Sequence, residues 1–299
     1  MTHFDRPIMI VCTGRSGSTI FYRVIARHRD VGWLSTLNHA FPSQTWLSVF
    51  SRLYPMSIFD SIRDHRLFPK PFSPYNFWKQ YLPGITRHDR PLFADDVPNE
   101  SIEPLRQTIA DVLKLQNKKR FLMKVTGWSR MAYFARVFPE IRFIYIKRNP
   151  RDVVSSWIQA GWLNVTNDVD SDAWEWGKVP AKYISVWNDM ERRPFLSAAI
   201  KTQLDIDDIR NNMALFPERC FELNYEDFVV DPVGQLSETL EFCELEWYDG
   251  FETLVRQTPI YNFADKWKKF LTEEEGEILT EFFKRINGAK KRQPIAQTV

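Results

Sequence analysis

A short polar stretch with one basic side chain follows the first apolar run of the chain. The residues Gly14-Arg15-Ser16-Gly17-Ser18-Thr19 lie between the apolar run 8–13 and a stretch with helical spacing of apolar residues. Backbone N–H groups of such a turn, together with a helix N-terminus, bind anions. The guanidinium of Arg15 and the hydroxyls of Ser18 and Thr19 add donors that suit a phosphate or sulfate. The stretch predicts an anion site, and the alternative is a tight turn with a surface arginine.

The stretch lacks the lysine of a nucleoside-triphosphate loop. That motif reads G-x-x-x-x-G-K-[ST], and no Gly-Lys pair follows Gly17. The apolar run 141–147 is followed by Arg148 rather than by an aspartate that could hold magnesium. A kinase or nucleotide hydrolase would therefore lack its lysine and its metal site together, and we expect no metal.

A second pair of candidate phosphate-binding side chains follows the run 141–147. Arg148 stands at the carboxyl end of this predicted strand, where ligands bind in open α/β sheets. Ser156 lies on the predicted helix 150–159, which begins with a proline. The two side chains could hold one phosphate from two sides. Taken alone, the stretch is equally compatible with an ordinary helix start and a polar helix face.

Strands and helices must alternate to position these side chains. Strands are expected at 8–13, 31–35, 120–126, 141–147 and 219–225, and helices at 18–28, 101–116, 129–138, 150–159, 233–244 and 273–286. This alternation predicts an α/β fold with three layers, in which helices flank a parallel sheet. We expect a single domain over 1–299, in which 40–98 and 157–215 form helical and loop insertions over the strand tips.

Composition restricts the classes of protein. The 299 residues carry a net charge of +2, which gives no reason to expect nucleic-acid binding. Three widely spaced cysteines predict neither a disulfide framework nor a zinc cluster. No stretch of 18 apolar residues and no signal-peptide pattern occurs, so the sequence predicts a cytoplasmic protein. The oligomeric state is left open.

Together the two phosphate stretches resemble the superfamily of sulfotransferases that use 3′-phosphoadenosine-5′-phosphosulfate (PAPS). Gly14–Thr19 is similar to the [PW]-R-S-G-[ST]-[ST] loop of the carbohydrate and tyrosyl branches. The resemblance implies that Arg15, Ser16, Gly17, Ser18 and Thr19 bind the 5′-phosphosulfate. "RNPRDVVSS" is similar to R-[DN]-P-R-x-x-x-S-S, which implies that Arg148 and Ser156 bind the 3′-phosphate.

Two later stretches extend the resemblance. "FELNYEDFVVDP" at 221–232 looks like the family's L-x-Y-E-D-L-x-x-D-P segment, and "DKWKKFLT" at 265–272 is similar to a Lys-Trp stretch that closes over the nucleotide. They imply that Tyr225, Lys266 and Trp267 also contribute to the nucleotide site. The family fold is like that of the P-loop NTPases, and 3′,5′-adenosine bisphosphate (PAP) is the product of the donor.

The chemistry of sulfuryl transfer fits these residue types. An SO3 group carries less charge than a phosphoryl group, so cations and backbone N–H groups can stabilise the leaving phosphate without a metal. The resemblance assigns this role to Arg15 and to Lys124, at the end of the predicted strand 120–126. The alternative for Lys124 is a surface cation after a strand.

The sequence departs from the family at the general base. The carbohydrate and tyrosyl branches have a glutamate about one strand after the loop helix, and an ungapped alignment places Ser35 and Thr36 there. The nearest candidates are His39, which can titrate near neutral pH, and the adjacent pair Asp95 and Asp96. Each has a structural alternative, as a packed histidine or as a helix cap or solvated turn.

Aromatic residues gather in the two insertions expected to face the acceptor. They are Trp46, Phe50, Tyr54, Phe72, Tyr75, Phe77 and Trp78 in the first, and Trp157, Trp162, Trp174, Trp176 and Trp187 in the second. Such rings could stack a sugar, a lipid or a phenol, but most such residues belong to a core. The acidic run "NDVDSDAWEW" disfavours a polyanionic acceptor. A P-loop kinase and a non-catalytic nucleotide-binding protein are the alternative functions.

Overall fold

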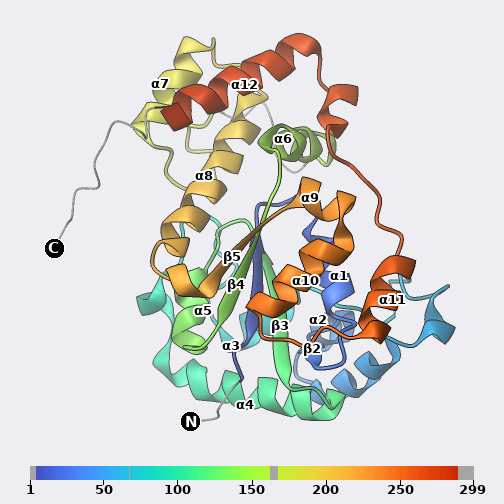
Figure 1. Ribbon diagram of the computed structural model, residues 1–299. Coiled ribbons are helices and arrows are strands. Elements are labelled where there is room, and N and C mark those ends of the chain that lie inside the picture. The colour runs from blue at the N-terminus through green and yellow to red at the C-terminus, as the bar shows by residue number, and fades with distance from the viewer. Residues whose placement is uncertain (1–4, 67, 162–167, 289–299) are drawn as a thin grey trace.

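Five parallel strands form the centre of the molecule in the computed structural model, which describes residues 5–66, 68–161 and 168–288. The sheet order is β2-β3-β1-β4-β5, with β1 at Ile8–Cys12, β2 at Val31–Trp33, β3 at Arg120–Thr126, β4 at Arg142–Lys147 and β5 at Cys220–Asn224. Cys12 lies opposite Thr126 on one side and Ile146 on the other. The carboxyl ends of the three central strands therefore meet at one edge (Figure 1).

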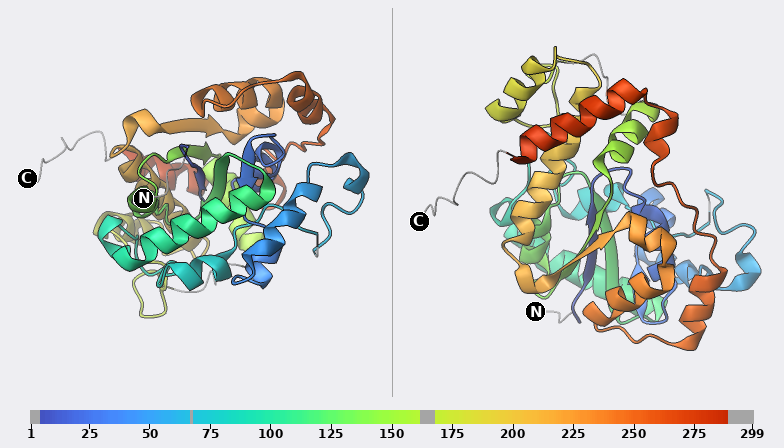
Figure 2. Two further views of the ribbon diagram at one scale, coloured as in Figure 1. Left: turned by 90° about the horizontal axis from the view of Figure 1, so that it is seen from below. Right: turned by 45° about the horizontal axis from the view of Figure 1, so that its top comes forward.

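Two apolar clusters cover the faces of the sheet. Met9 and Val11 of β1 point to one face, with α3 (Tyr75–Tyr81), α4 (Asn99–Gln116), α5 (Met131–Val137) and part of α8 (Leu196–Met213). Ile8 and Ile10 point to the other face, with α1 (Ser18–Ile25), α9 (Tyr225–Val230), α10 (Pro232–Phe242) and α11 (Asp249–Gln257). This alternation follows from the two-residue period of a strand. Figure 2 shows the sheet edge-on between the two helical layers.

A third apolar cluster lies beyond the carboxyl ends of the strands. It joins α6 (Pro150–Gln159), α7 (Ala181–Asp189), the first half of α8, and α12 (Glu273–Gly288) (Figure 1). Trp128, which follows β3, packs in the same cluster. The edge of the sheet that carries the predicted site is thus covered by helices from the second half of the chain.

The fold is the expected three-layer α/β arrangement, and the predicted strands and helices are present. The insertion 40–98 is less regular than its neighbours, with α2 at Thr36–Ala40 just before it and short 3-10 helices at Thr45–Leu53, Ser57–Phe59 and Ala94–Asp96. Further 3-10 turns lie at Pro217–Arg219 and Lys266–Lys269. Phe77 and Trp78 of this insertion belong to the core rather than to a cover over the strand tips.

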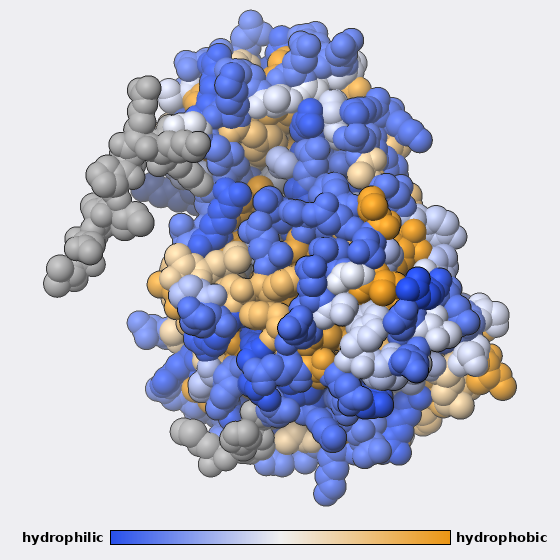
Figure 3. Space-filling model, in the orientation of Figure 1, coloured by the Kyte–Doolittle hydropathy of each residue, from blue (hydrophilic) through white to orange (hydrophobic). Residues whose placement is uncertain are grey.

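The surface is dominated by polar side chains. Figure 3 shows hydrophilic residues over most of the face that it draws, with apolar patches between them. Among the described helices, none combines the length and the apolar character needed to cross a membrane.

Candidate active site

A large cavity lies at the carboxyl ends of β1, β3 and β4. Its volume is about 980 Å³, and its walls include the whole loop Gly14–Thr19. The predicted residues Lys124, Arg148, Ser156, Tyr225 and Lys266 line it as well. Residues predicted from five separate stretches of the sequence are therefore brought to one cavity, which we call the loop cavity.

The backbone of the loop explains its glycine at position 17. Gly17 has φ +79°, and a Cβ there would lie 2.2 Å from the ring of Tyr225. Arg15 also has a positive φ of 68°, which costs free energy for a residue with a side chain. Ser18 begins α1, so the loop N–H groups and the helix N-terminus sit together, as an anion site requires.

Arg15 and Arg148 connect the two predicted phosphate stretches directly. Arg15 Nε donates to Ser156 Oγ at 2.8 Å, and Arg148 Nη1 donates to the carbonyl of Arg15 at 2.9 Å. Arg148 lies over the ring of Tyr225 at 4.5 Å and donates through Nη2 to the carbonyl of Phe263. Its Nε is buried and has no hydrogen-bond partner among the described residues. A buried, unsatisfied cationic donor at the cavity wall fits an anionic ligand.

Asp152, near the start of α6, does not belong to a solvated polar face of that helix. Its side chain is buried, and its carboxylate accepts backbone N–H groups from Asp265 and Trp267 at 3.0 Å each. It also lies 3.9 Å from Arg148. Asp152 thus fastens the segment 258–272 to α6 at the rim of the loop cavity. Arg148 precedes α6, so its separation of four residues from Asp152 is not an ordinary helical pair that the sequence could have signalled.

Lys266 and Trp267 have different surroundings within that segment. Lys266 lines the loop cavity. Trp267 does not: its ring packs against α12, where a Cβ on Gly276 would lie 2.3 Å away, and Arg151 stacks on it at 4.3 Å. Trp267 therefore supports the segment from outside the cavity.

Lys124 stands inside the loop cavity, near the end of β3. Its Nζ donates to Thr19 Oγ1 at 3.1 Å and lies 5.7 Å from the centre of the Tyr22 ring. Burial lowers the pKa of the Lys124 ammonium, although the nearby Cys12 acts in the opposite direction. A desolvated ammonium next to the loop hydroxyls can stabilise negative charge that develops there.

A second cavity, which we call the aromatic cavity, borders the loop cavity. Its volume is about 420 Å³, and Gly14 and Thr126 line both cavities. Its other walls are Tyr75, Thr86, His88, Gly127, Trp128, Arg130, Trp157, Trp176 and Lys201. Trp157 separates the two spaces: its Nε1 donates to the Gly14 carbonyl at 3.2 Å, and a Cβ on Gly14 would lie 2.8 Å from its ring.

The cations of the aromatic cavity are already compensated. Lys201 pairs with the buried Asp205 and lies over the rings of Trp128 and Trp176 at 4.8 and 5.4 Å. Arg130 donates to the carbonyls of Ile85, Trp128 and Arg87. Burial is the main cause that raises the pKa of Asp205, and Lys201 opposes this shift. These two cations are therefore engaged by groups of the protein itself.

The two candidate bases from the sequence lie away from both cavities. His39 packs against Phe72, with a ring separation of 5.1 Å, and against α3, where burial and Lys79 lower its pKa. Asp96 is held by Arg90 and by the backbone N–H of Phe93, and the bond to Arg90 is the main reason that its pKa falls to about 2. Neither residue, nor Asp95, is part of either lining.

Few of the predicted aromatic residues line a cavity. Tyr54 lines the loop cavity, and Tyr75, Trp157 and Trp176 line the aromatic cavity. Trp187 is buried in the third apolar cluster, whereas Trp46 and Phe50 are exposed, and Trp162 lies outside the described residues. His88, Thr126 and Lys201 escaped prediction because their sequence neighbours form no motif.

Comparisons with known proteins agree with this geometry. A family model described as a sulfotransferase family matches residues 7–249. A sulfotransferase of Mycobacterium avium has a similar structure, with 15% identity, a TM-score of 0.58, and coverage of 96% of this chain and 77% of that one. A sulfotransferase of Mycobacterium tuberculosis H37Rv has 14% identity and a TM-score of 0.57, with coverage of 96% of this chain and 77% of that one. The sulfotransferase domain of the curacin biosynthetic pathway has 14% identity and a TM-score of 0.51, with coverage of 94% of this chain and 99% of that one. At these identities the similarity shows a shared fold. No curated protein matches the chain.

Proposed function

The chain belongs to the sulfotransferase family, and from this premise we propose that it moves a sulfuryl group from PAPS to the hydroxyl of a compact phenol. PAP is then the second product. The observation that carries the proposal is the meeting of the two cavities at Gly14 and Thr126, beside the loop and Lys124.

The residues of the loop cavity fit the donor. The loop N–H groups, Arg15, Ser18 and Thr19 would hold the 5′-phosphosulfate at the N-terminus of α1. Arg148, whose Nε is buried and lacks a hydrogen-bond partner in the described part of the chain, and Ser156 would hold the 3′-phosphate. The donor supplies the activated sulfuryl group when it is bound. Arg15 and Lys124 stabilise the charge on the phosphate side, because both cations lie next to the loop.

The aromatic cavity favours a flat and neutral acceptor. Its volume of about 420 Å³ is within the range of small-molecule sites, which is about 300–1,000 Å³. Trp128, Trp157, Trp176 and Tyr75 offer ring faces and edges against which an aromatic ring packs well. An extended glycan or a long lipid would exceed this space, so we favour a phenol within the broader class of small-molecule acceptors.

The test is PAP release from PAPS, measured against phenol, cyclohexanol, methyl glucoside and decanol. We expect transfer to phenol above all. Transfer to the glucoside or to decanol alone would overturn the acceptor class, and no release with any hydroxyl would favour a non-catalytic protein.

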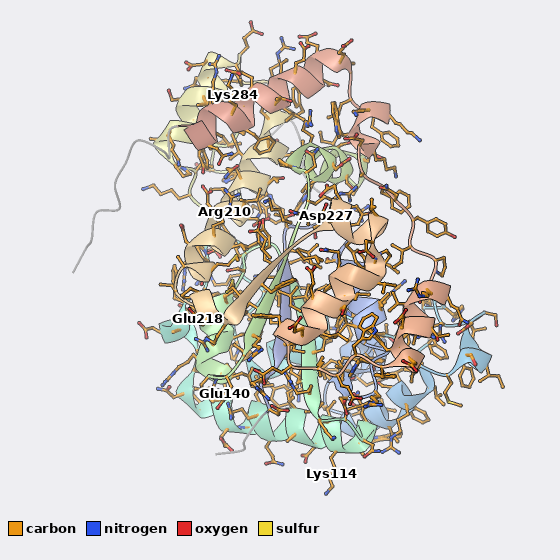
Figure 4. All side chains as sticks on the ribbon, viewed as in Figure 1. Lys114, Glu140, Arg210, Glu218, Asp227 and Lys284 are labelled. Atoms are coloured by element: carbon orange, nitrogen blue, oxygen red, sulfur yellow. The ribbon has the colours of Figure 1, made fainter. Side chains whose placement is uncertain are left out.

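The donor site is tested with Arg148→Ala. Loss of a charge-assisted hydrogen bond should weaken PAP binding by about 1.5–3 kcal/mol, which calorimetry measures. Arg210→Ala, on the outer side of α8 (Figure 4), is the matched control and should bind PAP as the wild type does. Equal affinity in Arg148→Ala would contradict the donor site.

A further inference from the structure

The aromatic cavity contains four titratable side chains among the described residues of its lining. They are Tyr75, His88, Arg130 and Lys201. If the acceptor hydroxyl binds there, its proton must pass to a group that can accept one. The candidates from the sequence, His39 and Asp96, do not line this space. The choice therefore lies among these four side chains.

Three of the four are poorly suited to accept a proton. Arg130 keeps its charge, and its guanidinium donates to three backbone carbonyls. Lys201 is a charged donor that pairs with the buried carboxylate of Asp205. The hydroxyl of Tyr75 already carries the proton that it would have to gain. The neutral imidazole of His88 has a free ring lone pair for this task.

The backbone around His88 is fixed to the end of β3. The carbonyl of His88 accepts the indole N–H of Trp128 at 2.7 Å. Arg130 donates to the carbonyls of Ile85 and Arg87, at 2.9 and 2.8 Å. Trp128 and Arg130 follow Thr126, which borders both cavities. The histidine is therefore held relative to the strand tip where the sulfuryl group would arrive.

A carboxylate faces the ring of His88. Nε2 lies 3.6 Å from Glu175 Oε2, and the ring of Trp176 lies 5.2 Å away. The other charged groups around the imidazole are the Arg87–Asp89 pair on its own segment, with Arg130 and Lys201 across the cavity. A carboxylate next to Nε2 favours the tautomer that keeps its proton there, which leaves the lone pair on Nδ1. The partner of one ring nitrogen thus sets which nitrogen carries the lone pair.

We propose that His88 is the general base of the transfer and that Glu175 is its positioning residue. The assignment rests on the proposed function. As the bond between the acceptor oxygen and sulfur forms, the bond between sulfur and the bridging oxygen of the donor breaks. The hydroxyl proton passes to Nδ1 of His88, and the electron pair of the broken bond leaves with the 5′-phosphate of PAP. The His88 side chain is 50% exposed, so the imidazolium can return its proton to water.

The experiment measures kcat/KM against pH for His88→Gln, with phenol and with the more acidic 4-nitrophenol as acceptors. Because a less acidic hydroxyl depends more on the base, we expect a loss of about 10²- to 10⁴-fold with phenol and a much smaller loss with 4-nitrophenol. The acidic limb of the wild-type profile should vanish. PAP affinity, measured by calorimetry, should stay within about twofold, since the 3′-phosphate partners are untouched.

Three further variants sharpen the result. Glu175→Gln should reduce kcat with phenol less than His88→Gln does and should leave KM for phenol and the rate with 4-nitrophenol nearly unchanged, because Glu175 acts only by orienting the imidazole. His39→Gln tests the histidine that the sequence suggested as the base, and this variant should keep the acidic limb of the kcat/KM profile. His65→Gln, at an exposed position outside both linings, is the matched control.

The outcomes separate this assignment from the function on which it rests. If His88→Gln keeps the wild-type kcat/KM and the acidic limb of its pH profile, or if it loses equally with both phenols, the assignment of His88 as general base is overturned. Loss of the limb in His39→Gln instead would transfer the role to that residue. A wild type that binds PAP but sulfates neither phenol would overturn the acceptor class and with it this assignment. A wild type that does not bind PAP would overturn the donor as well.

Discussion

Lys124 combines a buried ammonium group with a proposed role in the transfer. Its ammonium stands near the end of β3, bonded to Thr19 Oγ1 at 3.1 Å and close to the Tyr22 ring. Burial lowers its pKa from the ordinary value of 10.5, so the fold disfavours the charged form. A cation kept in such surroundings at a cost in stability is typical of a functional site.

The variant Lys124→Met separates chemistry from binding. We expect kcat to fall by about 10²- to 10³-fold, while the affinity for PAP changes far less, because the 3′-phosphate partners are untouched. Rapid-mixing kinetics and calorimetry on one preparation measure the two quantities. A large loss of affinity with little loss of kcat would make Lys124 a binding residue instead.

Lys124→Met should also change how the stability of the folded protein depends on pH. The folded-state pKa of Lys124 is lowered, so its burial costs stability at neutral pH, and the cost disappears as pH rises past the unfolded value near 10.5. Lys124→Met should therefore unfold at a higher temperature at pH 7, with a gain that shrinks toward pH 10.5. Lys114→Met, at an exposed position on α4 (Figure 4), should show no such gain.

The sequence predicts site residues that belong to a local motif. It does not predict residues that reach a cavity only through tertiary packing. Arg15, Arg148 and Ser156 belong to continuous patterns, and the structure brings them together. His88 and Lys201 reach the aromatic cavity only through packing of the segments 85–89 and 196–213 on the end of β3, which no spacing along the chain reveals. His39 was a candidate only because a histidine can accept a proton. In the structure its carbonyl accepts from Asn76 of α3, and its ring packs on Phe72.

The segment 258–272 contributes one wall of the loop cavity. It has no regular pattern beyond one 3-10 turn, and it crosses from α11 to α12 along the loop cavity. Four hydrogen bonds hold it to the rest of the molecule. The Asp152 carboxylate accepts from two backbone N–H groups, Arg148 donates to the carbonyl of Phe263, and the Tyr225 hydroxyl donates to the carbonyl of Tyr261. We expect its ordering to follow from these contacts rather than from its own propensity.

Asp152→Asn tests this element. The amide can accept only through one oxygen, and its NH2 group would face a backbone donor, so one or both bonds to Asp265 and Trp267 are lost. Hydrogen bonds to a charged acceptor contribute about 1.5–3 kcal/mol each, so amide exchange at Asp265 and Trp267 should accelerate at least tenfold. PAP should bind more weakly, because the wall formed by Lys266 is less ordered.

The control for this variant is Asp227→Asn. Asp227 is exposed on α9 (Figure 4) and accepts from Asn224, with no bond to the segment 258–272 among the described contacts. It should leave both exchange and PAP affinity as in the wild type. Unchanged exchange at Asp265 and Trp267 in Asp152→Asn would show that the segment is held by other means.

The regular elements were predicted more fully than the irregular ones for a physical reason. The runs 8–12 and 143–146 carry no charged residue because both faces of a central parallel strand are buried, and that constraint is visible in the sequence. Residues 40–98 contain the short helix α3 and several 3-10 turns, and their buried residues follow no lasting apolar period. Their aromatic residues could therefore not be divided in advance between core, cavity and surface.

At the scale of the whole molecule, the three apolar clusters are linked by shared elements. Helix α8 contributes Ile209 to the cluster on one sheet face and Leu196 to the cluster beyond the strand ends. The loop cavity is lined from the sheet side by the loop and from the other side by α6 and the segment 258–266. A ligand that bridges these walls should stabilise the sheet and the covering helices together, so we expect one folding unit.

Thermal unfolding in the presence of nucleotides tests that expectation. At a PAP concentration of 100 times its Kd, mass action should stabilise the native state by about 2.7 kcal/mol, and a single calorimetric transition should move upward as a whole. ATP with magnesium should leave it in place, because the loop carries no Walker lysine. Arg148→Ala at the same PAP concentration should move less than the wild type. Two transitions of which PAP moves one would contradict a single unit, whereas a shift with ATP and magnesium but not with PAP would mean that the loop cavity holds a triphosphate.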